Sequence, residues 1–274
     1  MTIRTSAVSL AAALAAIFAA PLVHAAEPGG KLPYGLRSAE LLPLQSGPDR
    51  TTVTAVRLVL EPGWKTYWRS PGDTGVPASF DWSASTNLAE AQPLWPRPEV
   101  IDSAGERTLG YHDELVLPIR IAAADADRPV GLKLSMDFGL CEEICVPARV
   151  DLAASATHPD DLPAGPDPQL AAALARVPDR GDDSVTCTLT PIDDGVQVAA
   201  TVTDAGPDST AALELMQDGV WVSQAEISRA DGRMTAVADF VAPSGKPFPL
   251  DTNKLRLTLI APDDAVEYQG CVRS

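Results

Sequence analysis

The sequence predicts an all-β protein with two antiparallel β-sandwiches joined by a proline-rich linker that contains a short helix. Short runs in which apolar and polar residues alternate follow one another without a helical period between them, which is typical of half-buried strands. Proline accounts for 25 of the 274 residues, well above the usual share of about 5%, and proline disfavours long helices. A length of 274 residues fits two modest domains of roughly 100 to 200 residues each.

The first 25 residues have the pattern of an export signal. Arg4 precedes an apolar run over residues 7–23, and small residues around Ala25 supply a cleavage position, as in secretory signal peptides. A transmembrane anchor is the weaker interpretation, because Pro21 interrupts the run. No later stretch reaches the roughly 18 consecutive apolar residues that span a bilayer. We therefore expect residues 1–25 to be removed and the mature protein to be soluble and periplasmic.

The first domain is predicted over residues 26–157. Residues 51–60 alternate in hydrophobicity and are followed by Glu61-Pro62-Gly63, which indicates a strand and then a turn. Because the runs are short and no helical pattern separates them, an antiparallel sandwich fits better than βαβ units. The further strands are expected at 64–69, 78–82, 115–122, 130–137 and 146–153.

The linker is predicted over residues 158–183, where Pro, Asp, Gly and Ala predominate. Within it, Asp167 is suited to cap, and Pro168 to open, a short helix from Gln169 to Arg176. Beyond it, the second sandwich is predicted over residues 184–274. Its strands are expected at 185–190, 196–203, 211–216, 220–228, 234–241 and 255–261.

The net charge of −16 excludes nucleic acid as a partner, because phosphate backbones are bound by clustered Lys and Arg. An anionic lipid surface is disfavoured for the same reason, and stable membrane insertion is not expected. The sequence also has no Gly-x-Ser-x-Gly elbow, no His-Glu-x-x-His, no Cys-x-x-Cys and no phosphate-binding loop, the signatures of several large enzyme classes. We therefore expect no cofactor.

The chain has four cysteines, Cys141, Cys145, Cys187 and Cys271. An even number in an oxidising compartment suggests two disulfides. Three pairings are formally possible, and the domain division favours Cys141 with Cys145 and Cys187 with Cys271. The second pair would close a loop of about 85 residues and stabilise the fold by roughly 4 to 5 kcal/mol, against about 2 kcal/mol for a five-residue loop. Cys187 and Cys271 are therefore the structural candidates.

The short pair, Cys141 and Cys145, is the candidate for redox chemistry. On a helix the two Cβ atoms would lie too far apart to be bridged without strain, so a turn between two strands suits the pair better. A small, strained and exposed disulfide is readily reduced, which fits a catalytic or regulatory role. An inert staple across a hairpin fits the spacing equally well.

The residues beside the short pair bear on its reactivity. Glu142 and Glu143 should raise the pKa of the thiols, because negative charge disfavours the thiolate, and only Arg149 is close enough in sequence to offset them. We therefore expect the dithiol to react mainly when a partner supplies complementary charge or a more acidic thiol.

Metal binding is the competing use of the same two thiols. Structural zinc takes four Cys or His ligands, but besides the thiols only His112 and, in the linker, His158 are available. Copper(I) accepts fewer and softer ligands, so Cys141 and Cys145, with Met136, form an alternative copper(I) site. Our preferred interpretation assigns no metal.

Four motifs in order carry a family resemblance. They are the segments 63–75 (GWKTYWRSPGDTG), 95–98 (WPRP), 110–118 (GYHDELVLP) and 141–147 (CEEICVP). The sequence resembles the N-terminal periplasmic domain of DsbD-type thiol:disulfide interchange proteins, and is closest to the branch called suppressor of copper sensitivity protein B. The resemblance covers about residues 32–153 and, through the second sandwich with its cysteine pair, extends over most of the mature chain.

The resemblance implies an immunoglobulin-like sandwich with protein-disulfide reductase or thiol:disulfide interchange activity. The cysteine pair would take two electrons from a membrane-embedded DsbD-like donor and give them to periplasmic thioredoxin-fold proteins. By position, Cys145 would form the mixed disulfide and Cys141 would resolve it. Because this chain ends at Ser274, the donor would be a separate polypeptide. The family's cap loop would correspond to residues 101–108, which lack the aromatic residue that better-known members carry there.

Several apolar residues could serve either packing or docking. Trp64, Trp68, Trp82 and Trp95 are expected mainly in the core, where sandwiches bury large aromatics, although a docking rim would also use tryptophan. The same question applies to Leu140, Ile144 and Val146 around the thiols. Two rival functions are a periplasmic copper(I) carrier or copper-tolerance protein that uses the same cysteines, and an inert β-sandwich interaction module.

Overall fold

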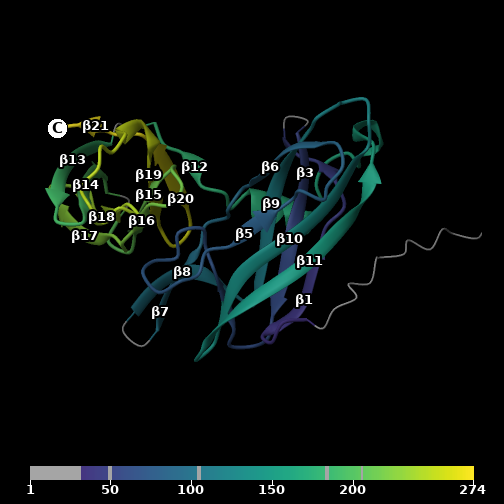
Figure 1. Ribbon diagram of the computed structural model, residues 1–274, viewed down its shortest axis with the longest axis horizontal. Helices are drawn as coiled ribbons and strands as arrows, with labels where there is room; N and C mark the ends of the chain where they lie inside the picture. The colour runs from purple at the N-terminus through teal and green to yellow at the C-terminus, as the bar shows by residue number, and fades with distance from the viewer. Residues whose placement is uncertain (1–31, 49–50, 104–105, 183–184, 205) are drawn as a thin grey trace, which may run out of the picture.

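The computed structural model describes residues 32–48, 51–103, 106–182, 185–204 and 206–274. The export signal expected at 1–25 lies outside the described residues. The rest of the chain forms two β domains that lie side by side (Figure 1), and most of it is strand. The all-β prediction is therefore confirmed. No helix in the described part of the chain is both long enough and apolar enough to cross a membrane.

The first domain has two antiparallel sheets. One runs in the order β1-β3-β9-β6, with β2 at the end of β3, and the other in the order β11-β10-β4-β8-β7, with β5 beside β10. The first sheet consists of β1 (Leu36–Leu41), β2 (Gln45–Ser46), β3 (Thr52–Leu60), β6 (Leu88–Pro93) and β9 (Glu114–Ala123). The second consists of β4 (Lys65–Tyr67), β5 (Ser79–Asp81), β7 (Glu99–Ser103), β8 (Glu106–His112), β10 (Val130–Cys141) and β11 (Cys145–Thr157).

The core of the first domain lies between these two sheets. Alternate residues of β9 and β10 point into it, and Leu117, Leu134 and Met136 are fully buried there. The positions of the four tryptophans distinguish between core packing and a docking rim. Trp64, Trp68 and Trp95 are buried in this core, and Trp82 packs half-buried against it. All four tryptophans therefore take part in core packing among the described residues of the first domain.

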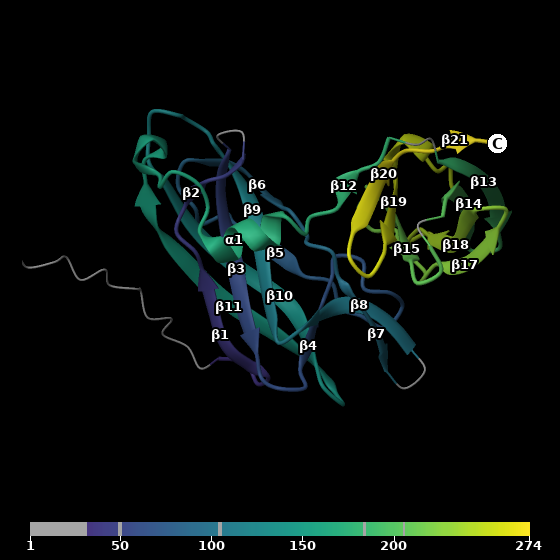
Figure 2. The same cartoon turned by 180° about the vertical axis from the view of Figure 1, so that it is seen from behind.

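The segment between the domains contains two short helices. The 3-10 helix η2 (Pro159–Asp161) comes first, followed by α1 (Pro168–Leu174) and the short strand β12 (Asp179–Arg180). Asp167 caps α1 as expected, because its Oδ1 accepts a hydrogen bond of 2.9 Å from the backbone N–H of Leu170. The helix ends two residues earlier than predicted. Leu170 is fully buried, and Figure 2 shows α1 lying against the sheet that contains β3 and β9.

The second domain also has two sheets, in the orders β12-β20-β19-β15 and β16-β18-β14-β13-β21, with β17 beside β18. Its pairs are antiparallel except for two short parallel ones, β12 with β20 and β13 with β21. Val198, Met234 and Phe240 are fully buried in its core. The strands are β13 (Thr186–Ile192), β14 (Gly195–Thr203), β15 (Thr210–Leu215), β16 (Trp221–Val222), β17 (Glu226–Ala230), β18 (Arg233–Val241), β19 (Leu255–Ile260), β20 (Ala265–Gln269) and β21 (Val272–Arg273).

One predicted strand of the second domain is divided. Residues 220–228 form β16 and the start of β17. Between them the chain turns toward the first domain, where the backbone N–H of Gln224 donates a hydrogen bond of 2.6 Å to Asp73. The break in the predicted strand therefore coincides with a contact between the domains.

Candidate redox site

The Cys141–Cys145 pair closes the hairpin between β10 and β11. The two cysteines are the last facing pair of this antiparallel ladder, and residues 142–144 form the turn between them. Their Cα atoms are 4.1 Å apart and a disulfide joins them. This is the turn between two strands that the spacing favoured.

The two cysteines of this disulfide differ in exposure. Cys141 is 1% exposed, whereas Cys145 is an exposed residue at the start of β11. A thiolate attacks one sulfur of a disulfide and displaces the other. Attack at the more exposed residue, Cys145, would make the sulfur of Cys141 the leaving group. The geometry therefore supports the division of roles that the family resemblance implied.

Tyr67, the last residue of β4, covers the disulfide. Its hydroxyl oxygen lies 2.6 Å from the Sγ of Cys141 and 3.1 Å from the Sγ of Cys145. Because the sulfurs of a disulfide carry no hydrogen, the hydroxyl donates. If Cys141 leaves as a thiolate, this donor stabilises the negative charge. Tyr67 is not among the site residues predicted from the sequence, although it lies within the first family motif.

Two glycines form the slot that holds the ring of Tyr67. A Cβ atom on Gly139 would lie 2.9 Å from the ring carbon Cε2, and a Cβ on Gly75 would lie 3.0 Å from Cδ1. A side chain at either position would therefore push the ring. Gly139 belongs to β10, two residues before Cys141, and Gly75 belongs to the loop between β4 and β5.

By register, the described residues of the expected cap loop at 101–108 lie away from the cysteines. These residues belong to the β7–β8 hairpin, and residues 104–105 lie outside the described part of the chain. The register aligns Cys141 with Lys65 and Lys65 with His112. Thr108 is four residues from His112 along β8, which is about 13 Å at roughly 3.3 Å per residue. For the described residues the prediction is therefore wrong, because strand pairing places them along β7 and β8 and away from the disulfide.

Residues 70–76, which we call the β4–β5 loop segment, cover Tyr67 instead. Val76 has its Cβ 2.9 Å from the position that a Cβ on Gly139 would take, and Gly75 packs against both Pro71 and the ring of Tyr67. The aromatic shield that residues 101–108 lack is therefore supplied by Tyr67 of β4, with this loop segment over it.

The charges around the pair are arranged differently from the sequence-based expectation. Arg149 forms ion pairs with Asp137 at 3.1 Å and Asp151 at 3.9 Å, so it does not offset Glu142 and Glu143. Both glutamates are exposed in the turn.

The nearest cation by register is Lys65, directly opposite Cys141 in the ladder between β4 and β10. Directly paired residues in an antiparallel sheet have Cβ atoms about 4.5 to 5.5 Å apart. The side chain of Lys65 therefore starts on the same face of the sheet as that of Cys141.

The residues considered for metal binding are dispersed. Met136 is fully buried and precedes Cys141 by five positions on β10, which places them about 16 Å apart at roughly 3.3 Å per residue. The Nδ1 atom of His112 is 2.8 Å from Glu99, and His158 caps η2. Within the described ranges, no group of three or more His, Cys, Asp or Glu residues could hold a metal ion.

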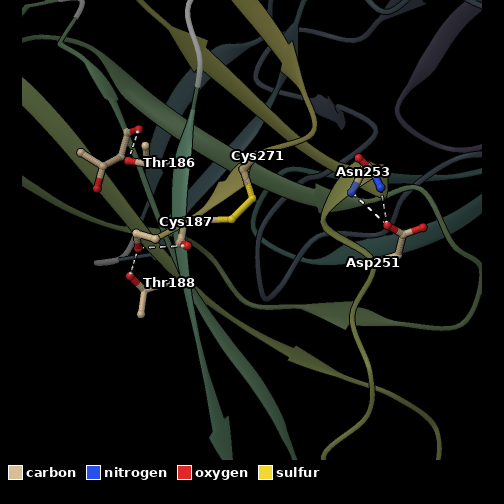
Figure 3. The surroundings of a disulfide bond; sticks show 8 residues. Thr186, Cys187, Thr188, Asp251, Asn253 and Cys271 are labelled. Atoms are coloured by element: carbon tan, nitrogen blue, oxygen red, sulfur yellow. Dashed lines mark hydrogen bonds between the residues drawn. A yellow bond between two sulfur atoms is a disulfide. The ribbon is translucent and has the colours of Figure 1, made fainter.

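The second disulfide, Cys187–Cys271, lies in the other domain. Cys187 is on β13, Cys271 lies just before β21 (Figure 3), and their Cα atoms are 5.8 Å apart. Cys187 is 1% exposed and packs in the second core. The bond ties the end of the chain to β13, and a structural role remains our prediction for it.

Comparisons with known proteins agree with this architecture. Residues 36–157 match the family model described as thiol:disulfide interchange protein DsbD, N-terminal. The crystal structure of the N-terminal periplasmic domain of ScsB from Proteus mirabilis is similar, with a TM-score of 0.61 and 22% sequence identity, over 84% of this chain and 91% of that chain. The comparison with curated proteins found no match.

The structural likeness shows a shared fold, and its coverage extends well beyond the segment that the family model matches. The resemblance predicted from the sequence motifs is thereby confirmed. Residues 36–157, which carry the Cys141–Cys145 hairpin, are similar to the N-terminal domain of DsbD-type thiol:disulfide interchange proteins.

Proposed function

We propose that the protein relays reducing equivalents in the periplasm through the Cys141–Cys145 pair. It would receive two electrons from a membrane-embedded DsbD-like donor on a separate chain and pass them to thioredoxin-fold proteins. The observation that carries the proposal is the asymmetry of the pair, in which an exposed Cys145 is bonded to a buried Cys141. This asymmetry occurs in the segment that matches the DsbD N-terminal family.

The proposed transfer to a partner balances as two exchanges. In the reduced protein, the thiolate of Cys145 attacks the partner's disulfide, so that a bond forms between Cys145 and one partner sulfur while the other partner sulfur leaves as a thiolate. The thiolate of Cys141 then attacks the sulfur of Cys145 and releases the first partner sulfur. Two electrons and two protons pass to the partner, which becomes a dithiol, and the Cys141–Cys145 disulfide is re-formed. When the donor's dithiol reduces the Cys141–Cys145 disulfide, the same two exchanges run in the opposite direction.

The surface around Cys145 suggests how such a partner docks. Ile144 is 74% exposed at the tip of the turn, and Val76, which lies beside Gly139 on the β4–β5 loop segment, is 45% exposed. Leu140 is fully buried and belongs to the core. Apolar side chains next to an exposed sulfur suit the shallow apolar surface beside a thioredoxin-fold cysteine. The exposed carboxylates of Glu142 and Glu143 favour a partner with basic residues at its rim.

Titration with glutathione tests the proposal, with each cysteine's alkylation read out by mass spectrometry. We expect the Cys141–Cys145 pair to titrate between about −120 and −270 mV, the range of known oxidoreductases, while Cys187–Cys271 stays oxidised. If both pairs have potentials below about −300 mV, both are structural by the same criterion, and the inert-module interpretation replaces the relay.

The copper(I) alternative has a separate test. The two thiols are the only soft ligands that the described residues bring together near the turn, since Met136 lies farther along β10. Copper(I) titration of the reduced protein, followed by mass spectrometry under native conditions, measures whether a stoichiometric complex forms. A tight 1:1 complex together with a potential below about −300 mV would favour the carrier function over the relay.

A further inference from the structure

The second domain contacts the first at Arg69, two residues after Tyr67. The guanidinium of Arg69 donates hydrogen bonds to Glu214 of β15 at 3.0 Å, to Glu267 of β20 at 2.5 Å and to Thr258 of β19 at 3.1 Å. The side chain of Arg69 is 14% exposed. Burial alone would lower the pKa of Arg69, but the two glutamates raise it overall. Arg69 is therefore a fully charged anchor within the interface between the domains.

A second contact fixes the same part of the chain. Asp73, in the β4–β5 loop segment, accepts the hydrogen bond from the backbone N–H of Gln224 in the second domain. Close by, the second-domain residues Ala212 and Ile260 are buried with the core of the first domain. The loop segment is thus held at Arg69, just before its start, and at Asp73 in its middle.

The chain between this anchor and the disulfide is short and well packed. Trp68 is fully buried between Tyr67 and Arg69, its backbone N–H donates to Leu109 at 2.9 Å, and its ring lies 4.3 Å from the guanidinium of Arg69. Gly75, one wall of the slot around Tyr67, belongs to the segment that Arg69 and Asp73 hold. A shift at the interface would therefore reach the position of the tyrosine ring.

We infer that Arg69 is a positioning residue, through which the second sandwich holds the hydroxyl of Tyr67 against the sulfurs of the Cys141–Cys145 disulfide. The first domain would then depend on the second for its reactivity as well as for its packing. The second sandwich would thereby contribute to the proposed relay, and its biological role rests on that proposal. The effect itself is on the rate at which the Cys141–Cys145 disulfide is reduced.

The test measures reduction of the oxidised, full-length mature protein by dithiothreitol, with quenched alkylation to follow each cysteine pair. The reductant loses two electrons and two protons and becomes a cyclic disulfide, while Cys141 and Cys145 become thiols. We expect Arg69→Met to slow this reduction by about two- to fivefold, because the donor to the departing sulfur of Cys141 is displaced. Arg69→Lys keeps the charge and should restore part of the rate.

A double-mutant cycle makes the test specific to positioning. If Arg69 acts through the hydroxyl of Tyr67, Arg69→Met should change the rate by less than about 1.5-fold in a Tyr67→Phe background, since coupled residues are not additive. The matched control is Arg256→Met. Arg256 approaches Glu214 at 4.0 Å and Glu267 at 3.8 Å from within the second domain, and its loss should leave the rate unchanged.

The inference would be overturned if the disulfide of Arg69→Met were reduced at the wild-type rate or faster. It would also be overturned if Arg69→Met slowed the reduction by the same factor in the Tyr67→Phe background. An equal slowing of the reduction by Arg256→Met would overturn it as well. If Arg69→Met fails to fold, Asp73→Ala decides the question, because Asp73 is exposed and its loss removes the contact with Gln224. These rates do not involve a protein partner. The proposed relay can therefore fail in its redox titration while the positioning role stands, or the reverse.

Discussion

Removing the hydroxyl of Tyr67 is the most direct perturbation of the site. Tyr67→Phe keeps the ring in its slot between Gly75 and Gly139 and removes only the oxygen that lies 2.6 Å from the Sγ of Cys141. The fold and the exposure of Cys145 should therefore be unchanged. The expected loss is the hydrogen bond that stabilises negative charge on Cys141 when an incoming thiolate attacks Cys145.

The magnitude follows from two general values. A hydrogen bond to a charged group contributes roughly 1.5 to 3 kcal/mol, and Tyr67 is buried, so solvent weakens it little. If about 0.45 of the charge has developed in the transition state, as Brønsted coefficients for thiol exchange suggest, the barrier rises by roughly 0.7 to 1.4 kcal/mol. Reduction of the Cys141–Cys145 bond should therefore slow about three- to tenfold.

Stopped-flow reduction by dithiothreitol, with alkylation at each time point, measures this rate. Tyr111→Phe is the matched control, because Tyr111 is equally buried and its hydroxyl donates to the backbone oxygen of Pro96 at 2.7 Å, away from the sulfurs. Reduction of Tyr67→Phe at the wild-type rate would refute the reasoning. An equal slowing in Tyr111→Phe would also refute it, since the effect would then be a general loss of rigidity.

Three further predictions concern the cysteines and the linker. Cys141→Ser should accumulate a mixed disulfide with a thioredoxin-fold partner on a non-reducing gel, whereas Cys145→Ser should not, and the opposite pattern would reverse the assigned roles. Replacing both Cys187 and Cys271 by Ala should lower the free energy of unfolding by about 4 kcal/mol without changing the reduction rate of the other pair, as denaturant titration and the dithiothreitol assay would show. Asp167→Ala should cost about 1 kcal/mol through loss of the α1 cap. The hydrogen bond from the N–H of Leu170 lowers the pKa of Asp167 below its ordinary 3.8. The cap's contribution to stability is therefore complete above pH 3.8 and is lost as the pH falls through the lowered pKa. Urea titrations of the wild-type and Asp167→Ala proteins across pH would detect this loss.

Local patterns predicted the strands whose alternation is long and regular. Residues 51–60 and 115–122 correspond closely to β3 and β9, whose alternate residues point into the core between the sheets. The β7–β8 hairpin was not predicted, because its residues are mostly polar or are interrupted by Gly110. Its place in the fold comes from pairing with β4. Local periodicity along the sequence does not indicate which strands pair with each other.

The same distinction separates the predicted from the missed parts of the site. Cys141 and Cys145 are four residues apart, so their relation is visible in the sequence. The contact of Tyr67 with Cys141 spans 74 residues and the ion pair of Arg69 with Glu267 spans 198, and both arise only when sheets and domains pack. The cap was placed wrongly for a related reason, since order along the chain did not reveal which loop folds over the β10–β11 turn.

The environment of the two sulfurs also favours one direction of exchange after docking. The turn with the exposed Glu142 and Glu143 lies between the two cysteines and bears on both, whereas the hydroxyl of Tyr67 is nearer to the sulfur of Cys141 than to that of Cys145. In the proposed relay, the acidic turn would disfavour an idle thiolate on either cysteine and so protect the reduced protein from small oxidants. Once Cys145 is held in a mixed disulfide, the thiolate needed for resolution would be that of Cys141, which the hydrogen bond from Tyr67 would favour. A basic rim on the partner would offset the acidic turn during docking, so that the attack by Cys145 becomes fast only at the surface where it is useful.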